Sequence, residues 1–126
     1  MGWRAETTAD FDGWWATLSD SAQRKVVAAV DVLEELGPTA GRPLADSVVG
    51  SRHSNMKELR VTQTIRIFFA FDRSRVAILL VGGDKRGKTK RFYRQMISKA
   101  DRIYDAHLHG AARETRLWQE EDPSAS

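Results

Sequence analysis

The fold is decided by residues 56–83, which read MKELRVTQTIRIFFAFDRSRVAILLVGG. Apolar and polar side chains alternate through the first part of this stretch, the period of two that is typical of strands with two different faces. Six apolar residues then follow without a break, as in a central strand covered on both faces. The predicted strands are residues 55–61, 65–71 and 76–81, with turns at 62–64 and 72–75 and an end at Gly82-Gly83.

The segment before this stretch has the period of a helix instead. Residues 3–7 predict a short first strand, and Thr7 begins a capping pattern with Asp10 three positions on. Apolar residues then recur at spacings of three and four in two runs, which predicts a helical hairpin ended by Gly37-Pro38. These apolar residues are Phe11, Trp14, Trp15 and Leu18 in the first run, and Val26, Val30, Leu33 and Leu36 in the second. Residues 39–54 read as a long connecting loop.

A final helix is predicted from about Lys90, where apolar residues again recur at helical spacing. The pattern predicts an α+β fold, in which an N-terminal strand and a helical hairpin pack on a small twisted antiparallel sheet and a C-terminal helix follows. We expect one domain over residues 1–118 and a disordered tail over residues 119–126.

The alternation within the strands also predicts two chemically different faces of the sheet. The helical hairpin should cover the apolar face, which is lined by Leu59, Val61, Ile65 and Ile67. Glu58, Arg60 and Arg66 fall on the other side of their strands, so we expect these three side chains to converge on an open polar surface.

Composition excludes several classes of protein. The chain has 126 residues, of which 41% are hydrophobic and 29% charged, enough for one core. Without cysteine, neither disulfides nor thiolate metal sites can form, and alternating His107 and His109 point apart on a helix. The longest apolar run, residues 76–81, is far shorter than a membrane helix. We therefore expect a cytoplasmic protein that contacts no membrane and needs no metal or cofactor.

Charge is strongly segregated along the chain. Residues 50–95 contain twelve Lys or Arg against three carboxylates, whereas residues 1–49 contain four against eight. Residues 96–126 also carry an excess of acid, so the net charge of +3 hides a strongly basic middle. Such segregation predicts a polyanionic partner.

The residue types in this basic segment suit cleavage of RNA. Arginine matches phosphate oxygens and stabilises the added charge of a phosphorane-like transition state. The neighbouring 2′-hydroxyl of RNA is a built-in nucleophile, so the protein needs a base, cations and an acid, but no metal. Glu58, His53 or a lysine with a lowered pKa is the candidate base, and Tyr93 can stack on a nucleobase or orient the 2′-hydroxyl.

Four motifs in order carry a family resemblance. They are GSRHSNMKELR at residues 50–60, RIFFAFD at 66–72, LLVGGDK at 79–85 and KRFY at 90–93. Together they resemble the RelE/HigB superfamily, in particular its HigB-like, phage Gp49-like branch, over residues 3–108.

This resemblance implies the toxin of a type II toxin–antitoxin pair. Such a toxin is an endoribonuclease that cleaves messenger RNA on the ribosome and is silenced by a cognate antitoxin, here expected to be a helix-turn-helix protein. The family's strand arginine matches Arg66, its basic residue matches Lys85 or Lys90, and its aromatic residue matches Tyr93. Glu58 stands where RelE carries a lysine, which leaves the general base open.

The resemblance and the clustering together give a predicted site. The predicted catalytic residues are Glu58, Arg60, Arg66, Lys85 and Tyr93, and the predicted RNA-binding residues are Arg52, His53, Lys57, Arg86, Lys88, Lys90 and Arg91. Simpler roles compete with these. Arg60 can form a plain ion pair with Glu58, Tyr93 lies on the apolar side of its helix, and His53 suits a loop-anchoring hydrogen bond.

Two other functions fit the same sequence. A ParE-like inhibitor of DNA gyrase would share the fold but lack the catalytic set. A non-catalytic nucleic-acid-binding module, or a decayed toxin, would bind RNA with a steep salt dependence and leave no cut ends.

Overall fold

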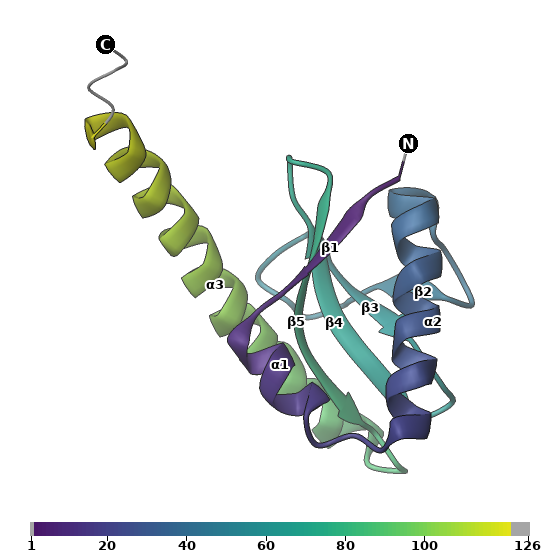
Figure 1. Ribbon diagram of the computed structural model, residues 1–126. Coiled ribbons are helices and arrows are strands. Elements are labelled where there is room, and N and C mark those ends of the chain that lie inside the picture. The colour runs from purple at the N-terminus through teal and green to yellow at the C-terminus, as the bar shows by residue number, and fades with distance from the viewer. Residues whose placement is uncertain (1, 122–126) are drawn as a thin grey trace.

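The computed structural model describes residues 2–121, and it describes side chains through residue 110. The chain forms a five-stranded sheet with helices on both sides, and the C-terminal helix extends well beyond the sheet (Figure 1). The elements are β1 (Arg4–Thr7), α1 (Ala9–Trp15), α2 (Asp20–Leu36), the 3-10 helix η1 (Gly37–Thr39), β2 (Ala45–Ser47), β3 (Met56–Arg60), β4 (Ile65–Phe71), β5 (Val76–Asp84) and α3 (Thr89–Glu121). Within residues 2–121, no helix combines the length and apolar character needed to cross a membrane.

The strand order is β1-β5-β4-β3-β2. β3, β4 and β5 form the antiparallel meander that the alternation predicts, and β1 adds a parallel strand on the far side of β5. β5 lies inside the sheet, and its side chains contribute to a hydrophobic core on each face, which explains its uninterrupted apolar sequence. The α+β class and the C-terminal helix are confirmed.

Two hydrophobic cores lie on opposite faces of the sheet. On one face α1 and α2 pack over the side chains of Ile67 and Phe69, and on the other α3 packs over Phe68 and Ala70. The first core confirms the predicted contact of the helical hairpin with the sheet. The second shows that the expectation of an open polar face is wrong, because the apolar stripe of α3 needs burial too.

β5 continues through the glycines that were expected to end it. Gly83 pairs with Arg66, and the strand ends at Asp84. A Cβ atom at Gly82 would lie 2.4 Å from the Trp14 ring, and one at Gly83 would lie 2.9 Å from Phe92. The two glycines thus let α1 and α3 approach the sheet closely, so they mark helix–sheet contact rather than a strand end.

The remaining differences concern segments with weak local signals. β2 interrupts the predicted loop of residues 39–54 and pairs antiparallel with β3, but its three residues are too few to show a period. α3 includes residues 119–121, which the sequence places in the tail, and residues 122–126 lie outside the described residues. The domain boundary at 118 therefore stays a prediction.

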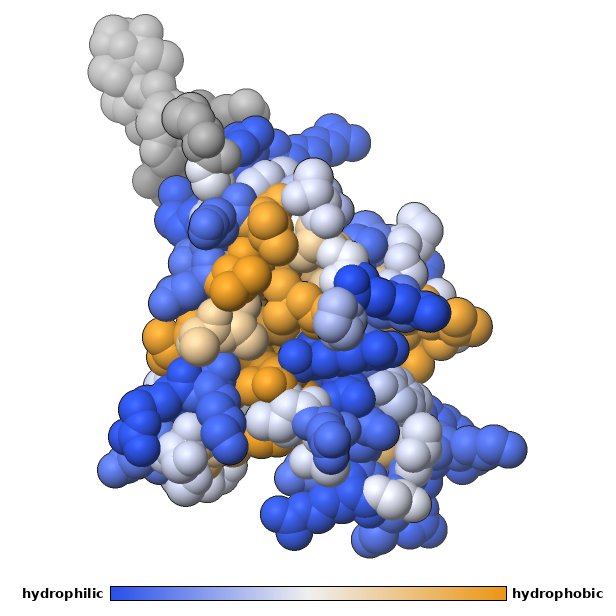
Figure 2. Space-filling model, turned by 90° about the vertical axis from the view of Figure 1, so that its right-hand side faces the viewer, coloured by the Kyte–Doolittle hydropathy of each residue, from blue (hydrophilic) through white to orange (hydrophobic). Residues whose placement is uncertain are grey.

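The face on which α2 lies also carries exposed apolar side chains. Viewed from this side, hydrophobic residues gather in one area with hydrophilic residues around it (Figure 2). On α2 itself Val27, Val32 and Leu36 are 44–48% exposed. Exposed apolar area of this kind often marks a contact with another protein.

Candidate active site

Sheet geometry brings three charged residues together beneath α3. Glu58 and Arg60 are two apart on β3, so they share one face, and Arg60 pairs directly with Arg66 on β4. Glu58 is 6% exposed and Arg66 8% exposed. The predicted convergence of these side chains is confirmed, but at a buried position.

Tyr93 completes this cluster from the first turns of α3. Its hydroxyl donates a 2.5 Å hydrogen bond to Glu58 Oε1. The Nε atom of Arg66 lies 3.6 Å from the same oxygen, and Nη2 of Arg60 lies 3.4 Å from Glu58 Oε2. One buried carboxylate thus faces two guanidinium groups and a phenol.

The arginines of this cluster are not fully satisfied by the protein. Arg66 Nη1 donates to the carbonyl oxygens of Thr62 and Ile65, at 2.7 and 3.1 Å. The buried Nε atoms of both Arg60 and Arg66 have no hydrogen-bond acceptor among the described residues. Unsatisfied buried donors are uncommon in folded proteins, and Arg66 Nε keeps only the Glu58 carboxylate at 3.6 Å as an ion-pair partner.

Tyr93 combines the two roles that the sequence leaves open. Its ring makes edge contacts with Phe68 and Phe92, at centroid distances of 5.9 and 5.3 Å, so it is part of the core. Burial, followed by its hydrogen bond to the Glu58 carboxylate, raises the pKa of the Tyr93 hydroxyl above the ordinary 10.0. The hydroxyl therefore keeps its proton at neutral pH and acts as a donor.

Arg60 is shared with a second carboxylate. Its Nη2 atom lies 3.5 Å from Oδ2 of Asp46 on β2, and Arg42 donates to the same oxygen at 2.8 Å. The Arg42 hydrogen bond is the main reason that the pKa of Asp46 lies below its usual value. Sequence reasoning missed this pair because both residues fall in the segment read as a loop.

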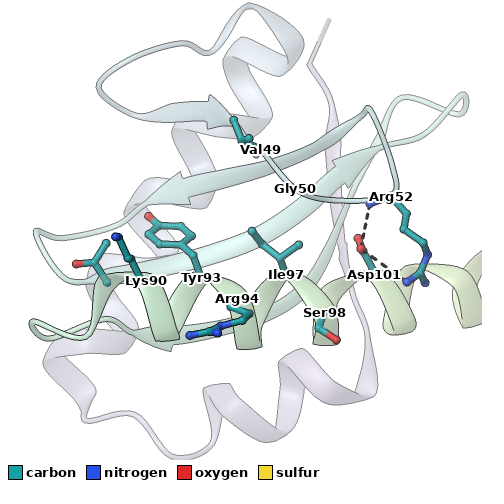
Figure 3. Close-up of a pocket in the computed structure, with 10 residues that line it drawn as sticks. Val49, Gly50, Arg52, Lys90, Tyr93, Arg94, Ile97, Ser98 and Asp101 are labelled. Atoms are coloured by element: carbon teal, nitrogen blue, oxygen red, sulfur yellow. Dashed lines mark hydrogen bonds and ion pairs between the residues drawn. The ribbon is translucent and has the colours of Figure 1, made fainter.

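A groove of about 600 Å³ opens beside Tyr93, between α3 and the loop before β3. Figure 3 shows Tyr93 and Ile97 rising from α3 toward the part of the loop that carries Val49 and Gly50. Lys90 and Arg94 lie on the same stretch of α3, at positions i and i+4. Arg94 is therefore a site residue that sequence reasoning missed, although its spacing from Lys90 gives a signal.

The loop that borders this groove is anchored on α3. Buried Asp101 accepts a hydrogen bond from Ser51 Oγ at 2.5 Å. It also accepts one from the Arg52 amide at 3.0 Å (Figure 3). The Arg52 side chain and His53 Nε2 both contact Asp105 one turn further on, the latter at 2.7 Å. His53 thus takes the anchoring role that the sequence allows, and the His53 and Arg52 hydrogen bonds lower the pKa of Asp105.

The basic turn between β5 and α3 leaves most of its cations unpaired. Arg86 contacts Asp84 at 3.1 Å. Among the described residues, none of the following side chains forms an ion pair: Lys85, Lys88, Lys90, Arg91 and Arg94. Lys57 lies on the opposite face of β3 from Glu58, so the structure does not bring it to the cluster.

No resident metal centre is evident in the part of the chain that the structure describes. There, no three histidine or acidic side chains come together as ligands. The side chains of the cluster and of the groove supply guanidinium, ammonium, carboxylate and phenol groups.

The fold is that of the RelE class that the sequence motifs indicate. Residues 13–105 match the family described as phage derived protein Gp49-like. This chain belongs to that family.

Two relatives and a solved structure support this assignment. The candidate toxin HigB3 of Mycobacterium tuberculosis (strain ATCC 25618 / H37Rv) is 53% identical over 89 residues, 70% of this chain and 78% of the relative. The candidate toxin HigB2 of the same organism is 43% identical over 112 residues, 86% of this chain. The chain spans only 55% of the length of HigB2. The crystal structure of the toxin-antitoxin complex RelBE2 from Mycobacterium tuberculosis has a similar fold, with a TM-score of 0.55 and 12% identity over 67% of this chain and 99% of that chain.

Proposed function

We propose that this protein is the toxin of a toxin–antitoxin system, and that it inhibits translation by cleaving messenger RNA on the ribosome. One observation carries the proposal. Arg60, Arg66 and the Tyr93 hydroxyl converge on the Glu58 carboxylate, and two arginine Nε atoms there lack an acceptor. Such a cluster is built to take up a phosphate group and to move a proton beside it.

The reaction that suits these groups is attack of an RNA 2′-hydroxyl on the adjacent phosphate. Glu58 would accept the proton of the 2′-hydroxyl after exchanging its hydrogen bond with Tyr93 for one with the substrate. The 2′-oxygen then bonds to phosphorus while the bond to the 5′-oxygen breaks, leaving a 2′,3′-cyclic phosphate and a 5′-hydroxyl. Arg60 and Arg66 would stabilise the additional negative charge in the transition state. Lys85 or Tyr93 would supply the proton of the leaving 5′-oxygen, and no step needs a metal ion.

Unpaired cations next to the cluster support RNA as the substrate. Charges with no partner in the protein attract a polyanion more strongly than charges already held in ion pairs. In the described part of the chain, Lys85, Lys88, Lys90, Arg91 and Arg94 are all of this kind. They lie on the turn after β5 and on the first turns of α3, so they would guide the RNA backbone toward Arg66.

An antitoxin is the protein partner that we propose. The relatives HigB2 and HigB3 are named as candidate toxins, and the RelBE2 structure is of a toxin–antitoxin complex. The exposed apolar residues of α2 offer a surface that another protein can cover. We expect the antitoxin to be a helix-turn-helix protein encoded beside the toxin.

The test is induced expression in a bacterial host, with mapping of new messenger RNA 5′ ends during the first minutes. Wild type is compared with Arg66→Ala, with Tyr93→Phe, which keeps the packed ring, and with Arg4→Ala. Arg4 is an exposed arginine on β1, so its replacement controls for the loss of one positive charge. We expect in-frame cuts from the wild type and Arg4→Ala, and strong reduction in the other two.

The outcomes separate the possible functions. Folding of each variant is first checked by its thermal unfolding, since Arg66 is buried. Full toxicity and cutting by folded Arg66→Ala and Tyr93→Phe would refute the assignment of the site. Growth arrest without new RNA ends would favour inhibition of DNA gyrase, and the absence of arrest would favour a binding module.

A further inference from the structure

Val49 is an apolar side chain held out in solvent at the edge of the groove. It is 91% exposed, although single exposed apolar residues are common and prove nothing by themselves. What distinguishes Val49 is the rigidity of its surroundings. The Val48 amide donates to the Met56 carbonyl at 3.1 Å and Val48 packs in the core beneath α3, while Ser51 is bonded to buried Asp101.

The opposite wall of the groove combines apolar and cationic side chains. Ile97 lies one turn beyond Tyr93 on α3 and packs partly against the core, which leaves part of its surface for a ligand. Lys90 and Arg94 line the same wall without an ion-pair partner among the described residues. Asp101, the acidic residue among the lining residues, is buried and already bonded to the loop.

Apolar walls with cations along α3 suit a nucleotide better than an apolar peptide. A nucleobase has a flat apolar face that can pack on the apolar walls. Its phosphate is negatively charged and can pair with Lys90 and Arg94. A volume of about 600 Å³ is that of an ordinary small-molecule pocket, with room for one nucleotide. The groove also adjoins Tyr93, so its occupant would lie next to the proposed cleavage site.

We propose that the groove binds one nucleotide of the RNA substrate, with its base against Val49 and Ile97 and its phosphate on Lys90 and Arg94. The proposal rests on the proposed function, because it places this nucleotide beside the phosphate that Arg66 would hold. It assigns Val49 and Ile97 to base contact, and through them a part of the sequence preference of cleavage. The loop anchored on Asp101 is then the element that fixes the width of the groove.

The test compares two probes by fluorescence anisotropy at several salt concentrations. One is a short RNA carrying 2′-O-methyl groups, which cannot be cleaved by 2′-hydroxyl attack, and the other is an abasic chain of the same length. Val49→Ala should weaken binding of the first probe about fivefold, the value of one or two lost methyl contacts, and leave the abasic probe unchanged. Arg94→Ala should weaken both probes and reduce the salt dependence.

Val32→Ala is the matched control, since Val32 is an exposed valine on α2, away from the groove. It should bind both probes like the wild type. If Val49→Ala also binds both probes like the wild type, or weakens the binding of both equally, the assignment of a nucleotide to the groove is wrong. A protein partner is then the expected occupant of the groove. If the wild type binds neither probe, the protein does not bind free RNA, and the proposed nucleotide site is wrong. The mapping of cuts by Arg66→Ala tests the proposed function separately.

Discussion

Asp101 is the buried carboxylate that fixes the loop of residues 51–53 on α3, and its replacement gives the sharpest test of the packing described above. It is 3% exposed and accepts two hydrogen bonds, from Ser51 Oγ and from the Arg52 amide. Asp101→Asn keeps the size of the side chain but removes its charge. The Asn oxygen can still accept from the Arg52 amide and its NH2 group can donate to the Ser51 hydroxyl, so two charge-assisted hydrogen bonds become neutral ones. A hydrogen bond to a buried charged group contributes about 1.5–3 kcal/mol, and we expect a loss of about 2–3 kcal/mol in the free energy of unfolding.

The assay is thermal and urea unfolding of Asp101→Asn beside Asp105→Asn. For a domain of this size the expected loss lowers the melting temperature by about 6–12 °C. Asp105 lies one turn further along the same helix and contacts the same loop, but its side chain is 46% exposed. Its replacement should have little effect, because exposed ion pairs contribute little to stability. An unchanged melting temperature for Asp101→Asn, or an equal loss for both variants, would refute the reasoning.

Two further predictions follow from close contacts of the sheet with its helices. Gly82→Ala places a Cβ atom 2.4 Å from the Trp14 ring and should destabilise the protein by about 1–3 kcal/mol. Gly13→Ala is the control, because its Cβ atom would have no neighbouring atom within 4 Å and should not destabilise the protein. Urea unfolding of the two variants measures the difference. Because the pKa of Tyr93 is raised in the folded protein, the stability that this contributes is complete below pH 10 and is lost as the pH rises through the raised value. Stability should therefore fall less steeply above pH 10 in Tyr93→Phe than in the wild type. An equal slope in pH-dependent unfolding would contradict the raised pKa of the Tyr93 hydroxyl, whose main cause is burial.

Much of the fold and part of the candidate site could be predicted from local pattern. Alternation in the strands placed Glu58, Arg60 and Arg66 on one face, and the helical spacing of α3 placed Tyr93 on the side that meets the sheet. Alternation shows on which face of a strand a side chain lies, but it does not show whether a helix packs over that face. The burial of this cluster beneath α3 was therefore missed, as were the contacts of Asp46 from the short strand β2.

The sequence by itself determined the period of each main element, the separation of basic from acidic segments and the residue types at the site, because each of these is a property of neighbouring residues. Only the tertiary structure decided which distant residues meet. Tyr93 and Glu58 are 35 positions apart, and Asp101 and Ser51 are 50 apart, so their local sequences do not show that they meet. Their partners are set by the packing of α3 on the sheet, which depends on Gly83 of β5 and on the shape of the core beneath α3.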